Sequence, residues 1–232
     1  MRIAFFSDIH ANLPALEATL EAIDALKPDS VYCLGDLVGY NYWAEEVCQI
    51  IRNRAIPTIM GNHDEYQSQV IEEGDKSNKG LTRDLLSTSS VDFLSSLPKT
   101  IDLTFEVHQK PFRIKMVHGS VYRINEYIRK DYPVDELIGM LPETDLLFCA
   151  HTHLPYYREI EKEGIKKYVI NTGSVGRPKD GDPRACFCML EINKNGIVPA
   201  FHRVEFDLDK AVSGISLGGF EPSLIQKMRE GR

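Results

Sequence analysis

The first sixty residues alternate between short apolar runs and segments with helical periodicity, and this alternation restricts the fold more than any other feature. The runs RIAFFSD, SVYCLGD and AIPTIM predict strands at 2–8, 30–36 and 55–60. Between them, residues 12–26 carry apolar side chains at helical spacing behind a capping Asn12, and residues 43–53 predict a second helix. A strand–helix–strand order indicates parallel βαβ units.

The rest of the chain follows a different pattern. Residues 66–97 contain the polar stretch EEGDKSNKG and predict one or two short helices outside the main sheets, with 66–90 forming a rim or lid. Strands return as TIDLTFEV, FRIKMVHG, DLLFCAH, KKYVINTG, ACFCMLEI and IVPAFHRVEF, with the first two and the last two as hairpins. Residues 213–232 are predicted as a tail that begins loosely and ends in a short helix near Pro222. We expect one α/β domain over 1–232, with two mixed β-sheets packed face to face and flanked by helices.

Composition limits the possible functions. The chain has 232 residues, of which 43% are hydrophobic, so it is large enough to bury a full core. Its net charge of −7 gives no basic field for nucleic acid, and an anionic substrate would need a local cation cluster or metal ions. We find no membrane span or signal-peptide pattern. The five cysteines lack zinc spacing; Cys186 and Cys188 are expected to pack as small apolar residues, and a cytoplasmic location is expected.

Metal-binding side chains follow five of the predicted strands: Asp8 and His10, Asp36, Asn62 and His63, His118, and His151 and His153. Each motif alone has a structural alternative, such as a helix cap, a turn residue or a hydrogen-bonded core histidine. If the five strand ends lie along one edge, however, these groups converge on one pocket. Carboxylates, imidazoles and one amide suit two divalent ions that share a bridging carboxylate. His108 and His202 lie outside the pattern, and we expect them to be structural.

The ordered motifs SDIH, GDLVG, GNHD, HGS and HTH resemble those of the calcineurin-like metallophosphoesterase superfamily. The longer stretches SDIHANLPALEATLEAI, GDLVGY and NTGSVGRP are similar to its compact prokaryotic branch, which includes small phosphodiesterases and diadenosine-tetraphosphate hydrolase-like proteins. The resemblance runs from Met1 to about Val204. Ala11 and Ala150 stand where this branch usually has glycine. The segment GYNYWAEE departs from the usual Gly-Pro turn of the branch, so the substrate preference of its members is not carried over to this chain.

The resemblance implies two metal ions, chosen among Mn, Fe, Zn, Co and Ni, with Asp36 as their bridge. One ion would be held by Asp8, His10, Asp36 and His153, and the other by Asp36, Asn62, His118 and His151.

His63 would then assist the leaving group, against the alternative of a histidine that is merely hydrogen-bonded in its turn. In the same motif, Gly61 is expected to permit a sharp exit from the strand and Asp64 to cap the next segment or orient its neighbour. Arg177 is the candidate phosphate contact, although a plain surface role is equally open. Lys179 and Arg184 are expected to be solvated loop charges.

The expected function is that of a dinuclear metal-dependent phosphoesterase. A water bridging two ions has a lowered pKa, so it supplies the hydroxide that attacks a phosphodiester or a nucleotide (poly)phosphate. The expected partner is a small, nucleotide-like phosphorylated molecule, with no stable nucleic-acid or membrane binding. Two alternatives stay open: a non-catalytic interaction scaffold of the same fold, as in the retromer coat, and a metallohydrolase acting on amides. The retained histidines favour the phosphoesterase.

Overall fold

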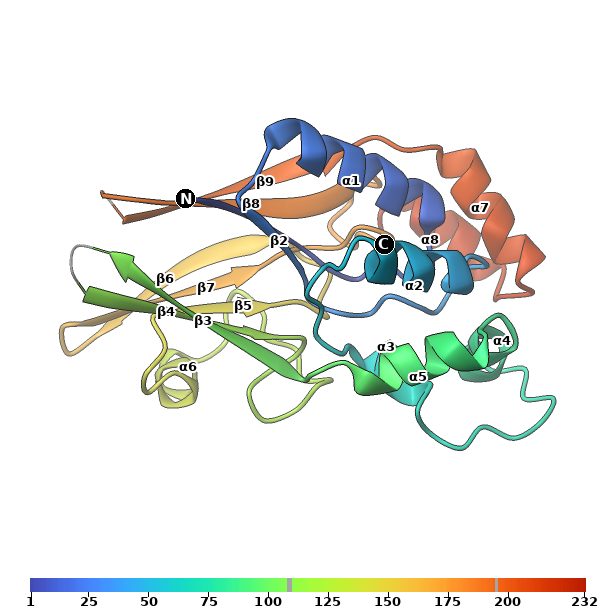
Figure 1. The fold of residues 1–232 in the computed structure, drawn as a ribbon, viewed down its shortest axis with the longest axis horizontal. Helices are drawn as coiled ribbons and strands as arrows, with labels where there is room; N and C mark the ends of the chain where they lie inside the picture. Colours follow the sequence, from blue (N-terminus) through green and yellow to red (C-terminus); the bar gives the residue numbers. More distant parts are fainter. Residues whose placement is uncertain (108–109, 195) are drawn as a thin grey trace.

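Nine strands form two sheets in the computed structural model, which describes residues 1–107, 110–194 and 196–232 (Figure 1). The first sheet has the order β2-β1-β8-β9, with β1 at Arg2–Phe6, β2 at Ser30–Cys33, β8 at Ala185–Asn193 and β9 at Gly196–Val204. The second has the order β3-β4-β5-β7-β6, with β3 at Thr100–Val107, β4 at Lys110–Val117, β5 at Leu146–Cys149, β6 at Tyr156–Lys162 and β7 at Ile165–Asn171. Both sheets mix parallel and antiparallel pairs, as the sequence predicts.

The sheets pack face to face because alternate residues of each strand point to opposite sides. In β1, Ile3 and Phe5 join the core between the sheets, whereas Ala4 and Phe6 join the core beneath the helices. The ring of Phe5 stacks on Phe148 of the second sheet, with the ring centroids 3.8 Å apart. Both faces of β1 are therefore buried, which explains its continuous apolar sequence.

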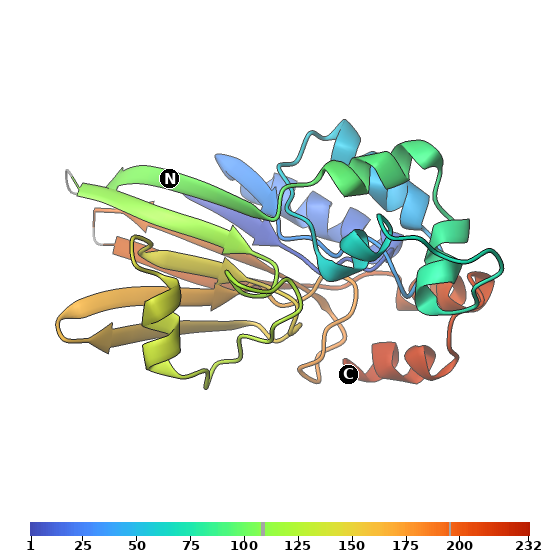
Figure 2. The same ribbon diagram turned by 90° about the horizontal axis from the view of Figure 1, so that it is seen from below.

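Helices cover the two outer faces (Figures 1 and 2). Helices α1 (Leu13–Leu26), α2 (Ala44–Asn53) and α5 (Thr88–Ser96) share the apolar core on the outside of the first sheet. Helix α6 (Val134–Met140) packs on the outside of the second sheet. The remaining helices are α3 (Asn62–Tyr66), α4 (Asn78–Asp84), α7 (Leu208–Leu217) and α8 (Ser223–Glu230). Among the described residues, no helix is long and apolar enough to cross a membrane.

Three predicted details are wrong. Residues 55–60 form no strand; they run beside β2 with one parallel bridge, Cys33 to Thr58, and Pro57 cannot donate a ladder hydrogen bond. Strand β6 was not expected from its polar sequence, but it pairs with β7 at the edge of the sheet.

The predicted loose start of the C-terminal tail is helical instead, because α7 runs through Gly214 to Leu217. At Gly214, an added Cβ would lie 2.1 Å from the side chain of Asn41 and 2.4 Å from that of Trp43.

Other local predictions are confirmed. The side chain of Asn12 caps α1 by accepting a hydrogen bond from the backbone N–H of Ala15. Both hairpins form, and Cys186 and Cys188 are fully buried among apolar neighbours. Helix α8 begins directly after Pro222.

Candidate metal centre

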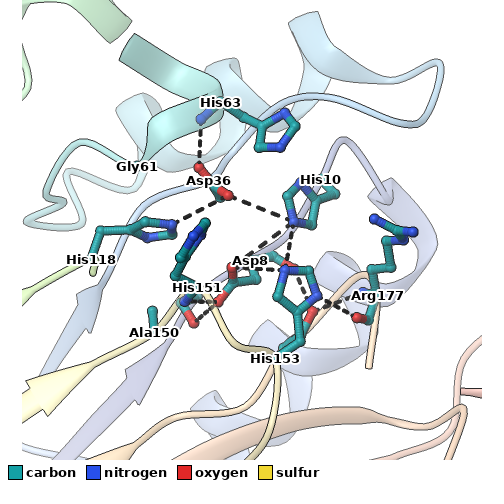
Figure 3. Close-up of polar contacts among 12 residues, drawn as sticks. Asp8, His10, Asp36, Gly61, His63, His118, Ala150, His151, His153 and Arg177 are labelled. Carbon is teal, nitrogen blue, oxygen red and sulfur yellow. Dashed lines mark hydrogen bonds and ion pairs between the residues drawn. The ribbon is translucent and has the colours of Figure 1, made fainter. Parts of the chain in front are cut away.

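The segments that follow β1, β2, residues 55–60, β4 and β5 meet at one edge of the two sheets (Figure 3). The Nε2 atom of His118 lies 3.3 Å from Oδ2 of Asp36, and Nε2 of His10 lies 3.7 Å from the same oxygen. On the other side, Nε2 of His153 lies 3.2 Å from Oδ1 of Asp8. All seven expected ligand residues are buried here: Asp8, His10, Asp36, Asn62, His118, His151 and His153.

These side chains form sets in which the potential ligand atoms lie within 4.8 Å of one another. One set is Asp8, His10 and His153, and another is Asp36, His118 and His151. A third set joins His10, Asp36 and His63. The first two sets contain three residues each of the two ligand groups that the resemblance implies, while the third places His63 closer to those residues than the sequence indicated.

Four atoms at the site are buried and lack a hydrogen-bond partner. They are Oδ1 of Asp8, Oδ2 of Asp36, Oδ1 of Asn62 and Nε2 of His118, out of six such atoms in the described part of the chain. An unpaired buried polar atom costs free energy, so their concentration at one point indicates that something else binds them. Oxygen and imidazole nitrogen ligands from four different segments fit divalent transition metals.

The histidine rings are oriented by backbone carbonyls. The Nδ1–H groups of His10, His118 and His153 donate to the carbonyls of Val38, Leu34 and Arg177 at 3.2, 2.7 and 2.5 Å. In each case this directs Nε2 into the site. Outer hydrogen bonds of this kind fix the tautomer of metal-binding histidines.

The backbone at the site is strained. Asp8, His10, Asp36, His151 and His153 all have positive φ angles, between 51° and 64°, which non-glycine residues rarely adopt. Neighbouring backbone hydrogen bonds hold this conformation: Asp8 N–H donates to Gly35 O, and His10 N–H donates to Asp36 O. Strain of this kind clusters at functional sites because the surrounding structure has to enforce it.

Two glycines allow the segment after β2 to approach Asn62. A Cβ on Gly61 would lie 2.2 Å from both N and Oδ1 of Asp36, and one on Gly35 would lie 2.4 Å from Gly61 N. Gly61 itself has an ordinary φ of −94°, so close packing against Asp36, rather than a sharp turn, requires glycine there.

The charges at the site differ from one side chain to the next. Burial alone would raise the pKa of Asp8, but the charge and hydrogen bond of His153 and the charge of His118 together lower it. Burial alone would lower the pKa of His118, but the Asp36 carboxylate raises it to about 10. Burial lowers the pKa of His10, and it lowers that of His151 to about 4. The Asp8 carboxylate is therefore ionised near neutral pH and His10 and His151 are neutral, as metal ligands must be, whereas His118 would release a proton when a metal binds.

His63 is held by the neighbouring loops at the edge of the site. Its backbone N–H donates to Oδ1 of Asp36 at 2.8 Å. The amide of Asn78 accepts from Tyr40 N–H at 2.9 Å, which turns its Nδ2 toward Nδ1 of His63 at 3.3 Å. An amide nitrogen only donates, so Nδ1 of His63 is the acceptor and Nε2 carries the ring proton. Sequence spacing gave no signal for Asn78.

Asp64 has a structural position. It is fully buried, and its carboxylate accepts hydrogen bonds from Gly61 N–H and Leu37 N–H, both at 2.9 Å. Burial and the nearby charge of Asp36 raise its pKa to about 7. Asp64 thus caps the start of α3, as the sequence predicted, and ties it to the loop after β2.

A cavity of about 530 Å³ opens above the metal-ligand residues. Tyr66, Ser77, Asn78 and Lys79 from the 66–90 segment line it. Its other lining residues are Asp36, Tyr40, Asn62, His63, Asn125, Tyr127, His151, His153, Arg177 and Lys179.

The predictions for the charged loop were partly right. Arg177 lies in the cavity wall, with its guanidinium carbon 4.3 Å from the ring centroid of Tyr40. Lys179 is half-buried in the same wall, so the prediction of a solvated charge is wrong for it. Arg184 is exposed and pairs with Asp182 at 2.7 Å.

Comparison with known proteins identifies the family. Residues 1–195 match the family model described as the calcineurin-like phosphoesterase superfamily domain. The chain belongs to this superfamily. It is 34% identical to an uncharacterized protein, MJ0912, of Methanocaldococcus jannaschii, over 92% of this chain and 91% of the relative. It is 24% identical to the phosphodiesterase YfcE of Escherichia coli, over 82% and 88%.

A solved structure agrees with this assignment. The metallophosphoesterase of Sphaerobacter thermophilus superposes with a TM-score of 0.83 at 30% identity, covering 100% of this chain and 99% of that one. Membership of a metal-dependent family is consistent with the Asp and His sets described above.

The two positions at which this chain departs from the compact prokaryotic branch differ in their backbone conformation. Ala11 adopts a φ of +54°, a conformation that glycine reaches more easily, and the hydrogen bond from its N–H to Leu37 O supports it. Ala150 is not among the positive-φ residues, so no such strain arises there.

Several cavity residues were not expected. Tyr127 is 49% exposed and stacks on the His151 ring at 4.4 Å, while the carbonyl of Asn125 accepts from Nε2–H of His151 at 3.1 Å. Tyr40, from the GYNYWAEE segment, also lines the cavity. His202 lies on β9 and stacks on Phe187 away from the site, whereas His108 lies outside the described residues.

Proposed function

We propose that this chain is a dinuclear metal-dependent phosphoesterase that hydrolyses phosphodiester or nucleotide (poly)phosphate substrates. The observation that carries the proposal is the convergence, beside one cavity, of four buried ligand atoms that come from different segments and form no hydrogen bond. Membership of the phosphoesterase superfamily supports hydrolysis, and the name of the E. coli relative favours phosphodiesters.

The proposed ligands divide between two sites. Asp8, His10 and His153 would hold one ion, and Asn62, His118 and His151 the other. Asp36 would bridge the two, because its Oδ2 lies within 3.7 Å of both His10 and His118. The donor set suits Mn, Fe, Zn, Co or Ni.

When bound, two ions at this position supply a hydroxide nucleophile near neutral pH and neutralise charge on the phosphate. The residues of the chain set the geometry around that reaction. The carbonyls of Val38, Leu34 and Arg177 hold three of the imidazoles in place. The walls of the cavity would orient the ester so that its leaving oxygen faces His63.

His63 would donate a proton to the departing oxygen. The Asn78 amide directs its Nε2–H away from the rim loop, and the ring lines the cavity. Burial lowers the pKa of His63 in the free protein, whereas a bound phosphate anion would favour the protonated ring, in which Nδ1 also carries a proton and the Asn78 amide would turn its oxygen toward it. Proton donation of this kind is worth roughly 10²–10⁴-fold in rate.

Arg177 would contact a phosphate oxygen of the substrate. Its backbone carbonyl is fixed by His153, and its guanidinium lies over Tyr40, so the side chain is preorganised beside the site. The proposed substrate is a small nucleotide-like phosphoester, and the proposed location is the cytoplasm.

One experiment tests the proposal directly. Metal content is measured by mass spectrometry on the purified protein, which is then stripped and reloaded with each candidate metal. A panel of phosphomonoesters, phosphodiesters and nucleotide polyphosphates follows. We expect about two metal ions per chain and metal-dependent hydrolysis of diesters or nucleotides. A chain that binds no metal and hydrolyses none of the panel would instead act as a scaffold.

A further inference from the structure

Three cations beside the candidate metal centre have no carboxylate partner. Arg177 and Lys179 line the metal cavity, and Arg177 and Lys227 line a neighbouring cavity of about 540 Å³. Among the described residues, none of the three forms an ion pair. This differs from the exposed cations elsewhere, since Lys162, for example, pairs with Asp135 at 2.7 Å.

The two cavities are neighbours. Tyr40, Asn78 and Arg177 border both, so a ligand at the metal-ligand residues that extends past Arg177 enters the second cavity. The second cavity also contains Lys76, and Glu221 is the one carboxylate among its described lining residues. Arg177 borders a third cavity as well, again together with Lys227. The wall that these cavities share around Arg177 therefore carries a surplus of positive charge, in a protein whose net charge is −7.

The cations lie close enough to affect one another. Burial lowers the pKa of Lys179, and the charge of Arg177 lowers it further, while Asp8 and Asp36 oppose this and Lys227 has the smallest effect. Like charges that share a cavity wall repel one another, and an anionic ligand would relieve that repulsion.

Lys227 is held on a fixed element. Leu224 and Met228, on either side of it in α8, are buried in an apolar cluster with Ile215 and Phe220. After the helix, the carbonyl of Gly231 accepts from Gly181 N–H at 2.9 Å, which ties α8 to the loop that carries Arg177 and Lys179. Helix α8 lies beyond residues 1–195, which match the family model, so Lys227 comes from outside the matched part of the chain, whereas Arg177 and Lys179 lie within it.

We propose that Arg177, Lys179 and Lys227 form a second anion site, which binds a phosphate group of the substrate other than the one at the metal centre. This inference rests on the proposed phosphoesterase function. It narrows the substrate class to molecules with at least two phosphate groups, such as nucleoside diphosphate moieties, because a simple phosphodiester leaves this site empty. Planar guanidinium and mobile ammonium groups together suit the many oxygens of a polyphosphate.

The test compares two ligands that differ by one phosphate group. Adenosine 5′-monophosphate and α,β-methylene-ADP are titrated calorimetrically into metal-loaded protein at one free metal concentration. In the unaltered protein we expect the methylene compound to bind at least about tenfold more tightly, given the strength of hydrogen bonds to charged groups. Lys227→Ala should remove most of that difference and change the affinity for the monophosphate by less than about twofold.

Arg229→Ala is the matched control. Arg229 lies on the same helix but pairs with Asp209 of α7 at 2.7 Å, so its removal should leave the preference intact. Equal preference in the unaltered protein and in Lys227→Ala would overturn the anion site, even if metal content and hydrolysis agree with the proposed function. The two proposals can also fail separately. If the unaltered protein hydrolyses no phosphoester but prefers the methylene compound, and only Lys227→Ala loses that preference, the anion site is supported and the phosphoesterase function is refuted.

Discussion

The floor of the cavity consists of metal-ligand residues at the ends of sheet strands, whereas its rim consists of loops and short helices. Floor side chains are buried, and their strained backbone is fixed by hydrogen bonds such as the one from His10 N–H to Asp36 O. Rim residues such as Tyr127 and Asn125 are exposed. Side chains held by buried elements suit precise chemistry, whereas exposed loops more often differ with the ligand that they bind.

Replacing the shared carboxylate should have the largest effect. We expect Asp36→Asn to lose both metals together and to lower the turnover number by roughly 10⁴-fold or more, because one carboxylate serves both sites. Metal content and hydrolysis are measured on the same sample. Asp102→Asn, a similar change at an exposed position on β3, should leave both unchanged. Two retained metals with full activity would refute the bridging role.

His63 lies between floor and rim, and its removal should separate binding from catalysis. We expect His63→Ala to retain both metals and its fold, yet to lose roughly 10²–10⁴-fold in turnover on substrates with poor leaving groups. The loss should be small for p-nitrophenyl esters, whose leaving group needs little protonation. His202→Ala on β9 is the control. If metal is lost as well, His63 is a ligand, as its position near His10 and Asp36 would allow.

Gly61 tests how tightly the floor is packed. An added Cβ would collide with Asp36 at 2.2 Å, so we expect Gly61→Ala to weaken metal affinity by about 10–100-fold, as displaced supporting groups do. Gly139→Ala on α6, where a Cβ meets nothing within 4 Å, should leave metal affinity unchanged. Competition with a fluorescent chelator measures both variants. Equal metal affinities of the two variants would show that the residues around Asp36 can shift to accommodate the added methyl group.

Asn78 lies on the rim, and its side chain holds the ring of His63. Asn78→Ala removes the amide that directs the His63 ring, so we expect turnover on poor leaving groups to fall about tenfold, the worth of one such hydrogen bond. Lys79→Ala, the adjacent change, should not produce this dependence on the leaving group. A uniform loss across leaving groups in Asn78→Ala would contradict the positioning role.

The smallest effect concerns motion of the rim. If residues 66–90 act as a lid, their amides should exchange with solvent fast in the free protein and several-fold more slowly when a phosphate analogue binds. Hydrogen-exchange mass spectrometry measures this, with the β8–β9 hairpin as an internal reference. Unchanged exchange in 66–90 would mean a fixed rim.

Much of this molecule could be predicted from local patterns. The continuous apolar run of β1, the cap at Asn12 and the pairing of β3 with β4 depend on residues close in the chain, so the sequence shows them directly. Strand β6 and helix α7 could not be predicted in the same way. The polar sequence of β6 becomes a strand because β7 offers it an edge, and Gly214 stays helical because Trp43 packs against it.

For the site, the sequence by itself located the side chains that the structure brings together, because each of them directly follows a predicted strand. It could not determine that Asn78 fixes His63, that Lys179 enters the cavity wall, or that Lys227 from the last helix approaches Arg177. Those neighbours are separated by 15 to 50 residues and come together only when separate loops pack on the same sheet edge. Tertiary packing decided them, since no local periodicity records which loops will meet.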